Sequence, residues 1–160
     1  MQDKLIFLSG DASTGKTTTL KFLIAMLLNV GATVDYCRRT QVPTEQSILN
    51  EIDFEERHHL PAKDISIVLI LKGIRIGIRT EGDTIGSVWN AVVFFEKQKC
   101  DIGVAACHPE HLDRSESCLA HPWKKPIKFD KQKATSADLH KQENQAMAKV
   151  LFDEIMKGIN

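Results

Sequence analysis

Residues 10–17 read Gly10-Asp11-Ala12-Ser13-Thr14-Gly15-Lys16-Thr17, and the rest of the chain can be placed by working outward from this stretch. The apolar run 4–9 that precedes it is typical of a buried parallel strand. Residues 17–29 follow it, and they carry leucine and isoleucine on one face at helical spacing. The sequence therefore predicts a strand, a glycine-containing loop and a helix in direct succession.

The stretch fits the pattern G-x-x-x-x-G-K-[ST], the phosphate-binding loop known as Walker A. Consecutive N–H groups of such a loop form a concave nest for anions, and the start of the following helix adds its positive dipole end. We expect Lys16 to reach the β- and γ-phosphates and the Thr17 hydroxyl to bind Mg²⁺. A glycine turn with a solvated lysine is the alternative. The predicted nucleotide-binding residues are Gly10, Asp11, Ala12, Ser13, Thr14, Gly15, Lys16, Thr17 and Thr18.

Length and composition are typical of one globular domain spanning residues 1–160, with 42% hydrophobic and 26% charged residues. Lys plus Arg and Asp plus Glu both number 21, so the net charge is zero, which argues against a surface that wraps nucleic acid. No apolar run is long enough to span a membrane, and we expect no secretory leader, since the first residues lead directly into the first predicted strand. We therefore expect a cytoplasmic protein whose four cysteines are thiols.

A second strand is predicted over 32–37, and it ends in Arg38 and Arg39. Ligands of parallel α/β sheets collect at the carboxyl ends of strands, so Asp35, Arg38 and Arg39 are predicted to bind a substrate. The alternative is that they are surface charges at the start of a loop and bind no substrate. A short helix is expected over 44–51 with Thr44 as N-cap, and 55–59 is expected to be a solvated turn.

Two strand-like runs, 65–71 and 74–80, flank the dipeptide Lys72-Gly73, which is a hairpin signature. The second run is expected to lie inside the parallel sheet. Beyond it comes Glu81-Gly82-Asp83, where an acidic residue that holds Mg²⁺ is expected. Asp83 is the first candidate metal ligand and Glu81 the second; Asp83 could equally be a helix cap.

The remaining elements alternate between helix and strand. A helix over 85–99 is predicted to bury Trp89, and a buried strand follows over 101–107. A short edge strand is expected near Ile127, within a lysine-rich connector over 123–133. The last helix starts at Thr135-Ser136. Its predicted packing face consists of Leu139, Met147, Val150, Leu151 and Ile155.

Two features of the 107–121 region remain open from the sequence. Arg114 could neutralise charge on a transferring phosphate, or it could be a surface arginine. Four cysteine and histidine residues have spacings that resemble those of a four-ligand zinc site, but they match no common zinc-finger pattern. The preferred interpretation is a buried thiol with exposed loop histidines. The four residues are Cys107, His111, Cys118 and His121.

On the motif in residues 4–29, the chain resembles the P-loop NTPases. Its strand–helix alternation, size and Arg114 are loosely similar to nucleoside and nucleotide kinase-like members. The resemblance implies an α/β, three-layer P-loop NTPase-type sheet, mostly parallel, with an antiparallel hairpin and helices on both faces. Asp11 departs from the lysine that the variant-loop partitioning ATPases place after the first glycine. The guanine-binding string N-K-x-D does not occur, and the chain is too short for the lid domain of AAA machines.

The leading functional hypothesis is a Mg²⁺-dependent phosphotransferase that uses ATP or another nucleoside triphosphate and an unknown small-molecule acceptor. Its catalytic residues are predicted to be Lys16, Asp83 and Arg114, with Thr17 and Asp83 as metal ligands. A homodimer is compatible with it. The alternative is a nucleotide-dependent regulatory ATPase that acts through a protein or nucleic-acid partner. Nucleic acid is the less favoured partner because the chain is neutral.

Overall fold

The computed structural model describes residues 4–11, 14–82, 84–110, 126–132 and 136–159. Six strands form one mixed sheet in the spatial order β2-β3-β4-β5-β1-β6. The strands are β1 (Lys4–Ser9), β2 (Thr33–Cys37), β3 (Ser66–Leu71), β4 (Ile74–Arg79), β5 (Ile102–Cys107) and β6 (Ile127–Asp130). The helices are α1 (Lys16–Asn29), α2 (Glu45–Arg57), α3 (Ile85–Lys97) and α5 (Ala137–Met156). The predicted α/β class is confirmed.

Strand direction decides which residues meet at the edge of the sheet. β1 pairs in parallel with β5 and with β6, and β4 pairs in parallel with β5. β3 is antiparallel to both β2 and β4. The carboxyl ends of all the other strands therefore share one edge with the amino end of β3. This reversal brings the residues just before β3 to the edge where ligands of parallel sheets collect.

The predicted hairpin is present between β3 and β4. Lys72 and Gly73 both have positive φ, 51° and 78°, as a two-residue type I′ turn requires. The backbone twist of this turn matches that of the flanking strands, and glycine adopts it without a steric penalty. β4 also pairs with β5, so its expected position inside the sheet is confirmed.

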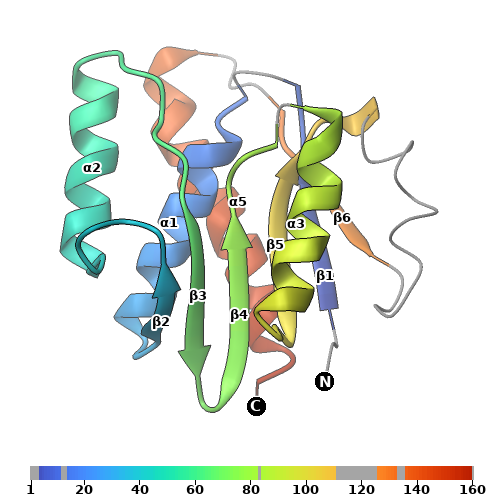
Figure 1. Cartoon of the computed structure of the whole chain (residues 1–160). Coiled ribbons are helices and arrows are strands. Elements are labelled where there is room, and N and C mark those ends of the chain that lie inside the picture. The colour runs from blue at the N-terminus through green and yellow to red at the C-terminus, as the bar shows by residue number, and fades with distance from the viewer. Residues whose placement is uncertain (1–3, 12–13, 83, 111–125, 133–135, 160) are drawn as a thin grey trace.

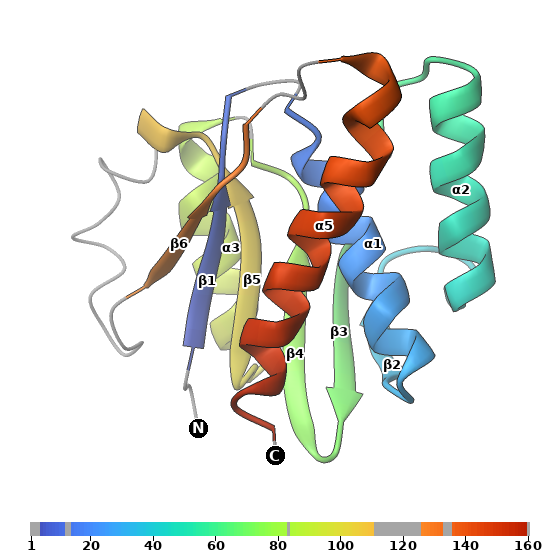
Figure 2. The same cartoon turned by 180° about the vertical axis from the view of Figure 1, so that it is seen from behind.

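Helices pack on both faces of the sheet. Alternate residues of β1 belong to two apolar clusters: Ile6 and Leu8 pack with residues of α1 and α5, whereas Leu5 and Phe7 pack with residues of α3. Figures 1 and 2 show the same arrangement, with α3 on one face and α1 and α5 on the other. α2 packs against α1.

A pair of glycines lets α3 approach the sheet closely. Gly77 of β4 and Gly103 of β5 are register partners, and the ring of Phe95 lies over both. A Cβ at Gly77 would lie 2.7 Å from Phe95 Cδ1, and one at Gly103 would overlap the same ring. Gly77 thus allows an aromatic ring to pack on the face of β4 that also carries arginines.

Three expectations from the sequence are wrong. Helix α2 runs on to Arg57, so residues 55–57 are helical rather than a solvated turn. Its extension is stabilised by Glu55, which is buried against a lysine of α1. Trp89 is 51% exposed because the neighbouring Val88 and Val92 take the buried face of α3. Leu139 and Val150 of α5 are also exposed, since Ala148, Leu151 and Ile155 supply its packing face.

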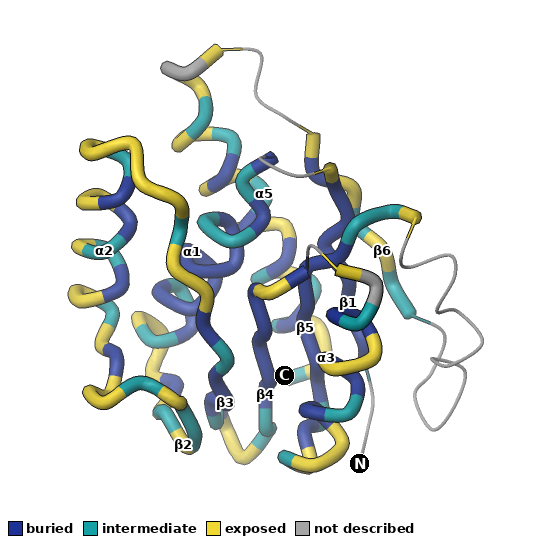
Figure 3. The backbone as a smooth tube through the Cα atoms, turned by 45° about the horizontal axis from the view of Figure 1, so that its top comes forward, coloured by how far each residue is buried: buried dark blue, intermediate teal, exposed yellow. Residues whose placement is uncertain are grey.

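Burial is highest in the sheet and on the inner sides of the helices, as Figure 3 shows, while the outer side of α2 is exposed. Among the described residues, no helix is long and apolar enough to cross a membrane. Cys37 and Cys100 are free thiols, as predicted. Burial raises the pKa of Cys100 to about 12, so this thiol is unreactive at neutral pH.

Candidate functional site

The loop between β1 and α1 lies at the carboxyl edge of the sheet, where its two glycines meet crowded surroundings. A Cβ at Gly10 would lie 2.5 Å from the carbonyl oxygen of Lys131. Gly15 has φ 90° and forms the N-cap of α1, and a Cβ there would lie 2.5 Å from Asn144 Oδ1. Both positions therefore require glycine, one for close approach and one for backbone conformation as well. Ala12 and Ser13 of the predicted loop lie outside the described residues.

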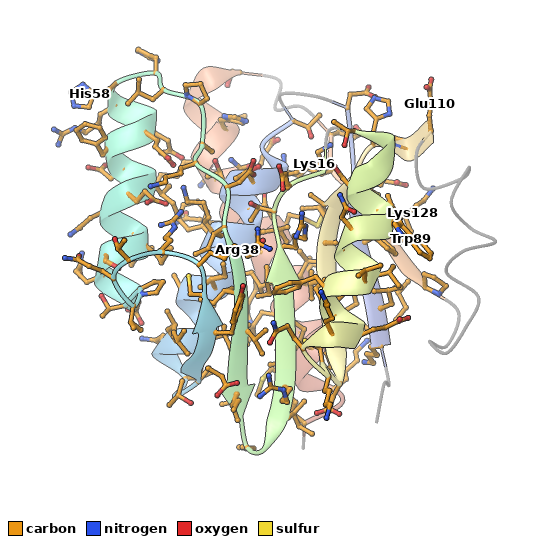
Figure 4. All side chains as sticks on the ribbon, in the orientation of Figure 1. Lys16, Arg38, His58, Trp89, Glu110 and Lys128 are labelled. Atoms are coloured by element: carbon orange, nitrogen blue, oxygen red, sulfur yellow. The ribbon has the colours of Figure 1, made fainter. Side chains whose placement is uncertain are left out.

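Lys16 is buried, with 5% of its surface exposed. Its ammonium donates hydrogen bonds to the carbonyl oxygens of Gly10 and of Cys107, the latter at 3.2 Å. These carbonyls belong to the ends of β1 and β5, so the charge is held at the edge of the sheet (Figure 4). Carbonyl groups are neutral acceptors, and an anion at the same place would form stronger, charge-assisted bonds with the ammonium.

Several polar atoms around the loop are buried without a hydrogen-bond partner in the described part of the chain. They include the hydroxyls of Ser9 and Thr14 and the side-chain nitrogen of Asn144. Buried polar groups are nearly always satisfied, so such a cluster calls for an explanation. Ser9 and Thr14 line a hollow of about 450 Å³, the size of a small-molecule site. A ligand with several acceptor oxygens would satisfy these groups.

A second lysine lies against the same loop. Lys131 follows β6 and is 5% exposed, and its ammonium donates to the carbonyls of Thr14 at 2.8 Å and Gln132 at 2.9 Å. Its backbone N–H also donates to the Ser9 carbonyl at 2.6 Å. Burial lowers the pKa of Lys131, although the carboxylate of Glu143 opposes this. The loop hollow is thus lined by a cation that an anionic ligand would stabilise.

Thr17 is the second residue of α1, and its hydroxyl donates a hydrogen bond to Asp64 Oδ1 at 3.4 Å. The same carboxylate oxygen accepts from the Thr80 hydroxyl at 2.8 Å. Asp64 precedes the antiparallel strand β3, which is why it reaches the edge formed by the ends of the parallel strands. Hydroxyl and carboxylate oxygens are the ligands that Mg²⁺ prefers. The sequence predicted Asp83, after β4, as the first candidate for the acidic partner of Thr17, and Asp83 lies outside the described residues. Among the described residues, the carboxylate that contacts Thr17 is that of Asp64, which comes before β3.

The segment that carries Asp64 is attached to α1 and α2 by ionic contacts. Lys21 of α1 is fully buried, and its ammonium lies 2.6 Å from carboxylate oxygens of both Glu51 and Glu55. It also donates to the Lys63 carbonyl at 3.1 Å, while the Lys63 N–H donates to Glu55 Oε2 at 2.7 Å. These bonds hold Lys63, and hence the neighbouring Asp64, in a fixed place beside α1.

The predicted substrate-binding residues lie in three different environments. Asp35 forms an ion pair with Arg75 at 2.7 Å. Arg39 donates two hydrogen bonds to Glu51, at 2.7 and 3.0 Å, and a third to the Asp64 carbonyl at 3.3 Å. Arg38 is exposed and donates to the Tyr36 hydroxyl at 3.3 Å. The structure therefore does not gather these three side chains around one point.

The other predicted residues can be placed only in part. Glu81 follows β4 and pairs with Arg79 at 3.1 Å. Cys107 is buried at the end of β5. Thr18 lies half-buried in the first turn of α1. The described ranges contain no group of three or more His, Cys, Asp or Glu side chains arranged to hold a metal. Besides Ala12 and Ser13, five predicted residues lie outside the described residues: Asp83, Arg114, His111, Cys118 and His121.

Sequence reasoning missed Asp64, Asn144 and Lys131 as residues of this site. Asp64 had a usable signal, because the hairpin at 72–73 implies that one of its two strands runs against the others. Comparisons of the chain with protein-family models, with curated proteins and with solved structures found no match. The case for function accordingly rests on the site itself.

Proposed function

We propose that this chain binds a nucleoside triphosphate in the loop 10–17 and transfers phosphate from it to a small-molecule acceptor, with Mg²⁺. The observation that carries the proposal is a Walker A sequence lying between a central parallel strand and a helix start, with Lys16 buried and unsatisfied hydroxyls beside it. On this proposal the fold is the three-layer P-loop NTPase type, and the protein is cytoplasmic.

The residues have distinct roles in this proposal. The N–H groups at the start of α1 and the Lys16 ammonium bind phosphate oxygens and stabilise the charge that develops on them during transfer. Lys131 adds a cation to the wall of the hollow beside the loop. Mg²⁺, when bound, neutralises charge on the phosphates and orients them. Arg114 keeps its predicted role as a further proposal, and Asp83, which the sequence favoured, is the competing candidate for the metal-binding carboxylate.

The metal ligands we propose are Thr17 and Asp64. Mg²⁺ is commonly bound by one or two carboxylates together with waters and substrate phosphates, so a single protein carboxylate beside a hydroxyl is enough. The two side chains already lie 3.4 Å apart. Thr80 and the backbone around Lys63 hold the carboxylate in place, so no large rearrangement is needed to form the site.

The test compares ATP binding with Mg²⁺ and with a chelator in three variants. Asp64→Asn keeps the oxygen that accepts from Thr80 but removes the charge, so the protein remains folded. We expect it to weaken binding in Mg²⁺ by about tenfold or more and to leave binding in chelator unchanged. Glu81→Gln serves as the control, because Glu81 contacts Arg79 instead. Asp83→Asn tests the carboxylate that the sequence favoured.

Two results would count against parts of the proposal. If Asp64→Asn keeps the full effect of Mg²⁺ while Asp83→Asn loses it, the metal ligand is Asp83 and our assignment is wrong. If ATP is hydrolysed with release of phosphate to water, and no hydroxyl compound changes that rate, the transfer step is wrong while nucleotide binding stands. A regulatory ATPase would give the second result.

A further inference from the structure

A second polar hollow lies on the α3 face of the sheet, away from the loop 10–17. Its volume is about 370 Å³, and it is bounded by the ends of β2 and β4 and by α3. Figure 4 shows Arg38 over the middle of the sheet and Lys16 near its upper edge. The residues that matter for its chemistry are Tyr36, Arg38, Arg79, Asn90, Phe94 and Lys97.

The alternating directions of side chains along β4 place this hollow and the Thr17–Asp64 pair on different sides of the sheet. Ile78 belongs to the cluster on the α1 side, and Thr80 contacts Asp64. Arg79 lies between them, and its guanidinium is 5.9 Å from the ring centre of Phe94 in α3. Successive side chains of a strand point to opposite faces. The hollow and the proposed metal ligands are therefore on opposite faces of the sheet.

Positive charge dominates the hollow. Arg38, Arg79 and Lys97 contribute three cations, and the nearby carboxylate is that of Glu81, which pairs with Arg79 at 3.1 Å. The Arg79 side chain is only 11% exposed, whereas Glu81 is 59% exposed and free to turn toward water. Arg79 Nε is buried with no hydrogen-bond partner among the described residues. A guanidinium held in this way has unused donor capacity, and among the described residues the ion pair it forms is with the exposed carboxylate of Glu81.

We propose that this hollow binds a small phosphate-bearing molecule, a phosphomonoester, at a site separate from the loop 10–17. Guanidinium groups match the geometry of phosphate oxygens with two parallel donors, and an ammonium adds a point charge. The volume lies at the small end of the range for ligand pockets, which suits one phosphate with a compact organic group. Tyr36 and Asn90 offer a hydroxyl and an amide to that group.

The ligand of this site is not the acceptor of the transfer reaction. Transfer requires reacting atoms within about 3–3.5 Å of each other. The hollow lies on the α3 face, whereas the side chains of Thr17 and Asp64 meet on the α1 side, at the carboxyl edge of the sheet. The inference is thus independent of the proposed function, and it holds whether or not the loop 10–17 binds a nucleotide.

Tyr36 is the only tyrosine of the chain, which gives the site its own probe. Protein labelled with 3-fluorotyrosine has one ¹⁹F resonance, and this resonance reports on the hollow. We expect inorganic phosphate and AMP to shift it saturably at fixed pH and ionic strength. The shift should persist in Lys16→Ala, which disables the other phosphate site. It should require at least about tenfold more ligand in Arg38→Gln/Lys97→Gln.

The control for loss of surface charge outside the hollow is Arg57→Gln on α2, whose ion pair with Asp53 is exposed on both sides. It should bind as the unmodified protein does. The double variant replaces two exposed side chains, so it retains its fold. The proposal is overturned if the resonance does not move, if Lys16→Ala abolishes the shift, or if Arg57→Gln weakens it as much as the double variant. An equal shift with acetate would overturn the preference for phosphate.

Discussion

Replacing Lys21 by methionine tests the ionic contacts that attach α2 and residue 63 to α1. The side chain is fully buried, and its ammonium lies between Glu51 and Glu55 at 2.6 Å from each. After the substitution Glu51 keeps its bonds from Arg39, but Glu55, only 11% exposed, keeps only the N–H of Lys63. Glu55 becomes an uncompensated, largely buried charge. Breaking one side of a buried ion pair costs about 3–5 kcal/mol.

The expected cost can be read from thermal or denaturant unfolding. For a chain of 160 residues the entropy of unfolding near Tm is about 0.34 kcal/mol/K, so Lys21→Met should lower Tm by about 9–15 °C. The matched control is Lys149→Met, another helix lysine with a carboxylate, Asp153, at 2.5 Å. Both members of that pair are more than half exposed, so its loss should cost about 0.5 kcal/mol or less.

A double variant separates charge from packing. Lys21→Met/Glu55→Gln removes the stranded charge but keeps an oxygen that accepts the Lys63 N–H. We expect it to be more stable than Lys21→Met alone, although it carries one more substitution. The reasoning is refuted if Lys21→Met costs no more than Lys149→Met, or if adding Glu55→Gln makes the protein less stable still.

Three further predictions concern packing and protonation. Gly103→Ala should destabilise the protein by about 1–3 kcal/mol because the new methyl overlaps Phe95. The methyl of Gly86→Ala in α3 would meet only the Asn90 side-chain nitrogen, at an ordinary contact distance of 3.9 Å, so this change should stabilise the protein by about 0.5–1 kcal/mol; denaturant titration distinguishes the signs. Burial favours a higher pKa for Glu51, but the hydrogen bonds that this carboxylate accepts from Arg39 and Lys21 outweigh burial and lower the pKa. The contribution of Glu51 to stability is therefore present above the ordinary pKa of 4.5 and is lost as the pH falls through the lowered pKa of the folded state. Unfolding measured down to about pH 3 should show this loss of stability, and the loss should be smaller in Lys21→Met. Because burial lowers the pKa of Lys131, an anion in the loop hollow should raise that pKa again, so that ATP binding at alkaline pH takes up protons. Calorimetry in buffers of different ionisation enthalpy measures the uptake, and observed heats that are the same in every buffer would contradict it.

Local patterns predicted much of this fold. The Lys72-Gly73 turn, the apolar run of β5 and the Thr44 cap of α2 are each encoded within a few residues, and all are present. The loop glycines are equally local, since Gly15 needs a positive φ that other residues rarely adopt. Such features depend on neighbouring residues, so sequence alone predicts them.

Long-range contacts account for most of what the sequence did not predict. Glu55 looked like part of a solvated turn because its partner Lys21 lies 34 residues away. Asp64 was not predicted because its position depends on the direction of β3 within the sheet, and a metal ligand is expected from sequence only at the carboxyl ends of parallel strands. In the sequence, nothing distinguishes Lys131 from the other lysines of the connector. Its contact with the loop 10–17 follows from the pairing of β6 with β1, which the sequence does not show.

Isothermal titration of ATP and GTP with Mg²⁺ is the most direct test of the central claim that loop 10–17 binds a nucleoside triphosphate. The unmodified protein should bind at least one of the two saturably. Lys16→Ala should weaken that binding by about ten- to a hundredfold, whereas Lys128→Ala, a half-exposed lysine on β6, should not change it. Thermal melts should show that both variants are folded. If neither triphosphate binds the unmodified protein, or if Lys16→Ala binds as well as Lys128→Ala does, the claim is wrong.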